Sequence, residues 1–142
     1  GHHMIRSCGC SIGLQAQIGG GLRLPHPQGV VVGNGARIGA MVTLAQHTTI
    51  GANFGTHDEL GHEMPSVGSG CWIMSGAVVA GPIKIGSNTI VGANSVLTRS
   101  VPPGSIVHSV PPATRAIDAL RFGRYVGRHE ADREGPIGPQ NG

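Results

Sequence analysis

The side chains best suited to chemistry in this sequence are its histidines. Eight occur in 142 residues, and the two in residues 1–4, Gly-His-His-Met, are typical of a tag remnant. A neutral imidazole can accept a proton near neutral pH, and it is also a common zinc ligand. His26, His47, His57 and His62 lie in the first half of the chain. These histidines could therefore serve in general-base catalysis or in zinc binding. The structural elements that position them distinguish the two roles.

A six-residue period organises the chain around these histidines. Between Val67 and Val101 a large aliphatic residue recurs at every sixth position, usually followed by a small residue. The recurring residues are Val67, Ile73, Val79, Ile85, Val91 and Leu97. Each unit is typical of a short strand and a corner that become stable only when stacked, and three units close one triangular coil. The repeat predicts an all-β fold, a left-handed parallel β-helix of about four coils.

The repeat extends toward the N-terminus with one slip in its rhythm. Its units begin at Ile12, Ile18 and Leu24, and the period then lengthens by two residues before it resumes at Val32 and runs to Ile50. The slip falls in the segment that contains the first of the candidate histidines. We therefore expect this corner of the β-helix to differ from the others.

Residues 52–66 form a second and larger interruption. The segment is polar and acidic and has too few apolar residues to form a coil, so it is predicted to project from the β-helix as a loop. Projecting loops on rigid scaffolds tend to carry function. This directs attention to His57, Asp58, Glu59, His62 and Glu63.

The chain is expected to divide into three parts. Residues 1–4 are the tag remnant, and residues 5–112 form the β-helix with its inserted loop. Within this domain, residues 106–112 are expected to cross the end of the β-helix as an extended cap, which hides an open sheet edge. Residues 113–142 are expected to form a short C-terminal helix, around Ile117, Leu120, Tyr125 and Val126, and a flexible tail.

The composition supports this fold and excludes several functions. Only 3% of the residues are aromatic and 12% are charged, whereas there are 25 glycines. The net charge of +3 comes without blocks of Lys and Arg interleaved with aromatic residues, so nucleic-acid binding is not expected. No apolar run approaches a membrane span. The three cysteines, Cys8 and Cys10 among them, are expected to be reduced thiols in a cytoplasmic protein.

Stacking in threes brings the third residues of four repeat units into one vertical column. The expected column consists of His26, Gln46, Ser75 and Ala93. It spans three coil steps of ~4.8 Å each, or roughly 14 Å. Short side chains and Gly76 leave room beside the backbone for an extended ligand. This length suits a phosphopantetheine arm, so the column predicts a CoA thioester whose reactive end lies at His26.

Several segments resemble a serine acetyltransferase of the hexapeptide-repeat superfamily. They are residues 24–26, 29–33 and 42–46, the loop that ends at Pro65, and residues 101–104. The resemblance covers residues 12–115 and is to a short form, in which we expect the N-terminal helical domain of the family to be absent. It implies a homotrimer with active sites between subunits, and acetyl-CoA as co-substrate without a metal.

The resemblance also implies catalytic roles. His26 would be the general base that takes the proton from an acceptor hydroxyl, a role typically worth ~10²–10⁴-fold in rate. His62, or backbone N–H groups near Gly51 and Ala52, would stabilise the negative charge on the thioester oxygen. The candidate CoA-binding residues are Gln46, Ser75, Gly76 and Ala93, which come from the column, together with Gly51 and Ala52.

The acceptor site departs from the family pattern. The family has Asp where Pro25 stands, Glu where Asn34 stands and His where Met64 stands. Asn34, Asp58 and Glu63 are the candidate acceptor-binding residues, because the loop carboxylates can replace the missing negative charge. The loop has no Arg or Lys for a substrate carboxylate. We expect a small hydroxyl acceptor, with serine as the leading candidate.

Two other functions fit the same fold. In a zinc enzyme resembling γ-class carbonic anhydrase, His26, His57 and His62 would hold the metal. In a scaffold protein, the repeats would serve only as structure. His47 is expected to face outward and to have a structural role.

Overall fold

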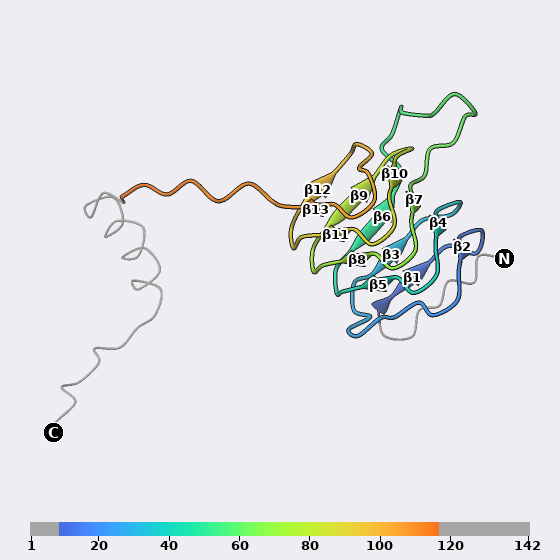
Figure 1. The fold of residues 1–142 in the computed structure, drawn as a ribbon, viewed down its shortest axis with the longest axis horizontal. Helices are drawn as coiled ribbons and strands as arrows, with labels where there is room; N and C mark the ends of the chain where they lie inside the picture. The colour runs from blue at the N-terminus through green and yellow to red at the C-terminus, as the bar shows by residue number, and fades with distance from the viewer. Residues whose placement is uncertain (1–8, 117–142) are drawn as a thin grey trace, which may run out of the picture. The chain divides into compact units, whose positions relative to one another are not determined.

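The computed structural model describes residues 9–116. Within this range the chain forms a parallel β-helix of three sheets, whose strands stack coil upon coil (Figure 1). Sheet A contains, in spatial order, β1 (Ser11–Ile12), β3 (Val31–Val32), β6 (Thr49–Gly51), β9 (Val78–Ala80) and β12 (Val96–Leu97). Sheet B contains β10 (Lys84–Ile85), β7 (Ser66–Val67), β4 (Arg37–Ile38) and β2 (Gln17–Ile18). Sheet C contains β13 (Ile106–Val107), β11 (Ile90–Val91), β8 (Trp72–Ile73) and β5 (Thr43–Leu44).

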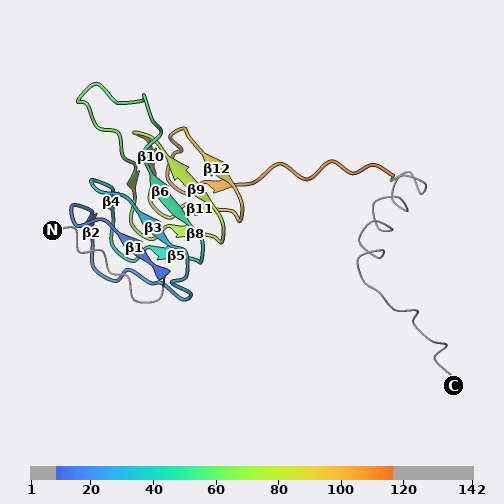
Figure 2. The ribbon, with the colours of Figure 1, turned by 180° about the vertical axis from the view of Figure 1, so that it is seen from behind.

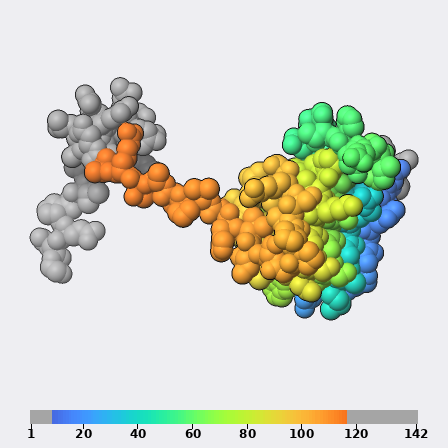
Figure 3. All heavy atoms as spheres, turned by 45° about the horizontal axis from the view of Figure 1, so that its top comes forward, coloured from blue at the N-terminus to red at the C-terminus, as the bar shows by residue number. Residues whose placement is uncertain are grey.

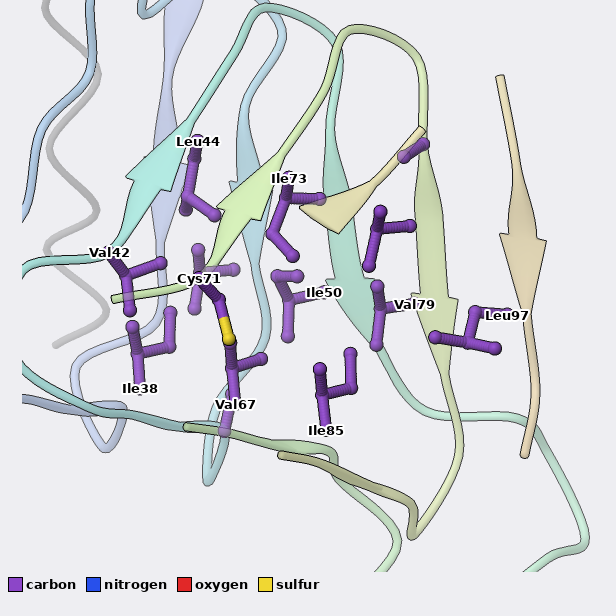
Figure 4. Close-up of a cluster of buried hydrophobic side chains, with 14 of the residues drawn as sticks. Ile38, Val42, Leu44, Ile50, Val67, Cys71, Ile73, Val79, Ile85 and Leu97 are labelled. Atoms are coloured by element: carbon purple, nitrogen blue, oxygen red, sulfur yellow. The ribbon is translucent and has the colours of Figure 1, made fainter. Parts of the chain in front are cut away.

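The aliphatic residue of each repeat fills the interior, as predicted. Figure 4 shows Leu44, Ile50 and Ile73 directed into the space that the three sheets enclose, and all three are fully buried. The fifth residue of most repeats is also buried, including Cys71 and Ala77. Each six-residue unit therefore contributes two side chains to a narrow core, which leaves no room for aromatic residues.

Close stacking of successive coils explains part of the glycine content. A Cβ added to Gly39 would lie 2.6 Å from both the backbone nitrogen and the Oγ of Ser69 in the next coil. A Cβ added to Gly68 would likewise lie 2.6 Å from the backbone nitrogen of Ser87. These corners accept only glycine because the neighbouring coil occupies the place of a side chain.

The projecting loop is present as predicted, with a small difference in its bounds. It leaves the β-helix after β6 and returns to β7, and both ribbon views show it extending away from the sheets (Figures 1 and 2). Its atoms also stand out from the surface in the space-filling view (Figure 3). Ser66, which the sequence assigned to the loop, is the first residue of β7 and pairs with Arg37.

The C-terminal cap prediction was wrong. Ile106 and Val107 form β13, which pairs in register with β11 and extends sheet C by one strand instead of crossing the end of the β-helix. Apolar residues at alternating depth suit a sheet surface better than a cap. The remaining residues of that segment up to Val110 are exposed and form no strand.

The chain divides after Val110 into two units, and residues 111–116 belong to the second. The predicted C-terminal helix and tail lie outside the described residues, apart from these first exposed positions. The described part of the chain has no helix that is long and apolar enough to span a membrane.

Candidate functional site

The predicted column lies at the corner where sheet C leads into sheet A, hereafter the C–A corner. The backbone N–H of Gly76 donates to the carbonyl of Gln46 at 3.1 Å, and the N–H of Asn94 donates to the carbonyl of Ser75 at 2.9 Å. These bonds place Gln46, Ser75 and Ala93 at equivalent positions in three successive coils. The prediction that they form a column is confirmed for these three residues.

The first member of the column differs from the prediction. The N–H of His47 donates to the carbonyl of Gln28 at 2.9 Å, so Gln28 and not His26 is in register with Gln46. The two-residue slip is accommodated between Leu24 and Pro27, where the chain bends at Pro25 and His26. His26 therefore stands beside the head of the column in an enlarged turn, and its side chain is exposed.

The column offers unpaired hydrogen-bond donors. Among the described residues, the backbone N–H groups of Gln46, Ser75 and Ala93 have no hydrogen-bond partner. The carbonyls of Gln46 and Ser75 are already used by the coil ladder. An extended ligand along this corner would therefore be held through its own carbonyl or other acceptor oxygens, and the amide carbonyls of a pantetheine arm are such groups.

His47 lies at the same corner, one residue beyond Gln46. Its ring extends back over Gly29, where a Cβ on residue 29 would overlap its Nδ1. Gly29 ends the turn that contains His26. The sequence assigned His47 a structural role and so missed its position beside this turn. The two-residue slip was the available signal, because it moves Gly29 into register with His47.

The loop carries an organised aspartate–histidine pair. Asp58 Oδ2 lies 3.0 Å from His62 Nδ1, and Asp58 Oδ1 accepts hydrogen bonds from the N–H groups of Leu60 and His62 at 2.9 and 2.8 Å. These bonds, that from the His62 backbone most of all, lower the pKa of Asp58 from its ordinary value of 3.8. The carboxylate orients the imidazole, while His57, Glu59 and Glu63 are exposed.

The loop and its neighbours lie at the opposite edge of sheet A from His26. The loop follows β6, at the corner where sheet A leads into sheet B, hereafter the A–B corner. Gly51 is the last residue of β6, in register with Ala80, and Ala52 is the first residue of the loop. Asn34 is at the same corner, where its Oδ1 accepts a hydrogen bond from the Gln15 N–H at 3.3 Å. One chain therefore does not bring His26 together with Asn34 or the loop.

Met64 closes the loop against the β-helix. Its side chain packs on the core and lies over Gly33, where an added Cβ would overlap Cε of Met64. The family's histidine at this position is thus replaced by an apolar contact. Met64 anchors the end of the loop beside Asn34.

A metal site and a surface depression were considered as alternatives to the column. Within residues 9–116 no three His, Cys, Asp or Glu side chains gather as a metal site, and one chain does not assemble His26, His57 and His62. An open depression of about 360 Å³ lies on sheet B beside Gln17, Arg37 and Ser66. It is on a different face from the C–A corner and does not extend the candidate site.

The chain is similar to known hexapeptide-repeat transferases. The family described as bacterial transferase hexapeptide (six repeats) matches residues 64–99. The serine acetyltransferase of Staphylococcus aureus strain Mu50 is 42% identical over 118 residues, which cover 82% of this chain and 54% of the relative. That of Staphylococcus xylosus is 42% identical over 109 residues, covering 77% and 49%. The chain spans about half the length of the curated relatives that it matches.

Solved structures give the same result. Serine acetyltransferase isoform 3 from Entamoeba histolytica, in complex with cysteine, superposes with a TM-score of 0.68 at 31% identity, covering 82% of this chain and 41% of that one. The Neisseria gonorrhoeae enzyme in complex with serine has a TM-score of 0.66 at 37% identity, covering 72% and 41%. A serine acetyltransferase in complex with CoA has a TM-score of 0.63 at 32% identity, covering 72% and 40%.

The fold and the repeats define a hexapeptide-repeat protein, and the predicted left-handed parallel β-helix is confirmed. Within that class, the predicted resemblance to serine acetyltransferases is also confirmed, over about four fifths of the chain.

Proposed function

We propose that this protein is an acyltransferase that moves an acetyl group from acetyl-CoA to the hydroxyl of a small acceptor. The column of free N–H donors at Gln46, Ser75 and Ala93, which leads to the turn of His26, is the observation that carries the proposal. From Ala93 to the turn of His26 there are three coil steps, or roughly 14 Å, which suits a pantetheine arm. The similarity to serine acetyltransferases, one of them solved with CoA, supports the same ligand.

In the proposed reaction His26 is the general base. Its neutral imidazole takes the proton from the acceptor hydroxyl as the oxygen attacks the thioester carbon. The C–S bond then breaks, the acetyl group becomes an ester, and the CoA thiolate leaves and takes up a proton. The exposed position of His26 at the head of the column lets both substrates reach it.

The proposed acceptor is a small alcohol, with serine as the leading candidate. Serine acetyltransferases solved with serine or cysteine support this choice. Asn34, Asp58 and Glu63 remain the proposed acceptor-binding residues. Asp58 already accepts three hydrogen bonds within its loop, so Glu63, which is exposed, is the freer carboxylate for an ammonium group.

We propose that the site is shared between subunits of a homotrimer. His26 is at the C–A corner and the loop is at the A–B corner, so one chain cannot supply both to one substrate. In the trimer, the loop of a neighbouring copy would place its His62 and the N–H of Ala52 near the thioester oxygen. These groups would stabilise the negative charge that develops there.

The outer faces of the β-helix support such an assembly. Sheet A exposes Val31 and Val96, and sheet C exposes Trp72, Ile90 and Ile106, where the Arg23 guanidinium lies 5.4 Å from the Trp72 ring. Sheet B instead presents Gln17, Arg37, Ser66 and Lys84. Two apolar faces and one polar face suit three β-helices that pack with the polar face outward. We further propose a cytoplasmic location, supported by the buried Cys71 thiol.

A thiol-release screen tests the proposed function. Purified protein with acetyl-CoA is offered serine, homoserine, sugars and amino alcohols, and free CoA thiol is measured with and without added zinc. We expect release that depends on a hydroxyl acceptor and not on zinc. Zinc-dependent turnover would favour the metalloenzyme, and absence of both acetyl-CoA binding and turnover would favour the scaffold.

Mixed assemblies test the shared site. Light scattering should give the mass of a trimer. Co-assembly of His26→Ala chains with His62→Ala chains should recover part of the activity that each variant lacks alone, because some interfaces then combine an intact His26 with an intact His62. A stable monomer, or mixed assemblies no more active than the separate variants, would contradict the shared site.

A further inference from the structure

His47 occupies a backbone position that is normally suited to glycine or asparagine. At the C–A corner the equivalent residues in successive coils are Gly29, His47, Gly76 and Asn94, and all four have positive φ, between 57° and 71°. Residues other than glycine rarely adopt this conformation, although Asn, Asp and His do so several times more often than the rest. The repeat itself requires the positive φ, but it does not require a histidine.

The side chain at this position points toward the preceding coil. A Cβ on Gly76 would overlap Oδ1 of Asn94, just as a Cβ on Gly29 would overlap Nδ1 of His47. The imidazole of His47 therefore lies over the end of the turn that contains His26. Both histidines are exposed. The described part of the structure shows no hydrogen-bond partner for the ring of His47, so its N–H is available to a ligand.

The location of His47 coincides with the reactive end of the proposed CoA column. The free N–H of Gln46 is adjacent to it in sequence, and His26 is three residues before Gly29. A thioester that ends at His26 would pass between these groups. His62 can reach this point only from another subunit, whereas His47 is supplied by the chain that supplies His26.

We propose that His47 is a second catalytic histidine of the transfer site. Its imidazole N–H donates a hydrogen bond to the carbonyl oxygen of the acetyl thioester and stabilises the negative charge that develops as the acceptor oxygen attacks. This inference rests on the proposed acetyl transfer and adds to it a residue from the same chain as the base.

The test compares His47→Gly with the matched control Met41→Gly. Met41 occupies the equivalent turn position at another corner, with φ of 57°, and its Sδ lies where a Cβ on Gly21 would be. Both variants remove a side chain from a left-handed position, so both should melt at or slightly above the wild-type temperature. His47→Gly removes a side chain from the C–A corner, whereas Met41→Gly removes one from another corner. A difference in activity between them therefore reports on the C–A corner.

We expect His47→Gly to lower kcat for CoA release by about 10²–10³-fold, as for loss of one oxyanion donor, with KM for acetyl-CoA nearly unchanged. Met41→Gly should retain wild-type kcat. His47→Asn keeps an N–H donor and tolerates the positive φ, so it should recover about tenfold of the loss.

A kcat for His47→Gly within twofold of wild type would overturn the assignment while the proposed function stands. An equal loss in Met41→Gly would also overturn it, because the effect would then be structural. Wild-type protein that neither binds acetyl-CoA nor releases CoA would refute the proposed function, and this inference with it.

Discussion

The carboxylate of Asp58 clasps His62, with Oδ2 3.0 Å from the ring Nδ1 and Oδ1 accepting the backbone N–H of the same residue at 2.8 Å. This pair closes a five-residue turn within an otherwise exposed loop. We expect Asp58→Ala to loosen residues 58–62, with backbone order parameters falling toward about 0.6. The β-helix should melt unchanged, because the loop lies outside the core. Glu59→Ala, at an exposed neighbouring residue, is the control, and an equal loosening there would show that Asp58 does not organise the loop.

The clasp should also depend on pH in a defined direction. The backbone and side-chain hydrogen bonds from His62 lower the pKa of Asp58 from 3.8. A lowered pKa means that the contribution of the ionised carboxylate is complete above the unfolded value and is lost as pH falls through the lower folded value. The NMR shift of the Asp58 side-chain carboxyl carbon should therefore show an ionised Asp58 from pH 8 to 5 and its protonation only below about pH 4. A transition of Asp58 above pH 5 would contradict the geometry.

Substitutions at two glycines, Gly39 and Gly20, test whether the close stacking of coils requires glycine. Gly39→Ala places a methyl group 2.6 Å from Ser69 and should lower the free energy of unfolding by about 1–3 kcal/mol. Gly20 has open space around the same added atom and no positive φ, so Gly20→Ala should be neutral or stabilising by up to about 1 kcal/mol. Denaturant titrations compare the two variants. Equal effects would show that coil stacking does not require glycine at residue 39.

Much of the fold could be predicted because the repeat is periodic and its core positions are not interchangeable. Ile50 and Ile73 recur at the spacing that fixes their sheets, and each is fully buried. Where the pattern stops, prediction was less accurate. Ile106 and Val107 form β13, because strand pairing continues past the last hexad as long as an edge is open.

The column was predicted correctly for three of its four residues, and its first member was out of register. Gln46, Ser75 and Ala93 share a column because their coils are regular. The two extra residues at Pro25 and His26 shift the first coil. The sequence shows that the repeat is two residues longer here, but it does not show whether the extra residues lie before or after the histidine. The location of the loop at another corner follows from the same count of repeat units, because the insertion comes one unit after Leu44.

The column makes a direct prediction for CoA binding. Ala93 is exposed, so Ala93→Trp should fill the corner without disturbing the core and should weaken CoA binding at least about tenfold by calorimetry. Gln17→Trp places the same ring on the outer face of sheet B and should leave the affinity unchanged. Wild-type affinity in Ala93→Trp would remove this corner as the CoA site.

The proposed reaction depends most directly on His26. The decisive measurement is acceptor-dependent CoA release by His26→Ala, beside His108→Ala, which removes an exposed histidine that follows β13. If His26 is the base, His26→Ala lowers kcat by at least about 10²-fold while acetyl-CoA affinity and the melting temperature stay near wild type, and His108→Ala remains fully active. Wild-type turnover in His26→Ala would contradict the account.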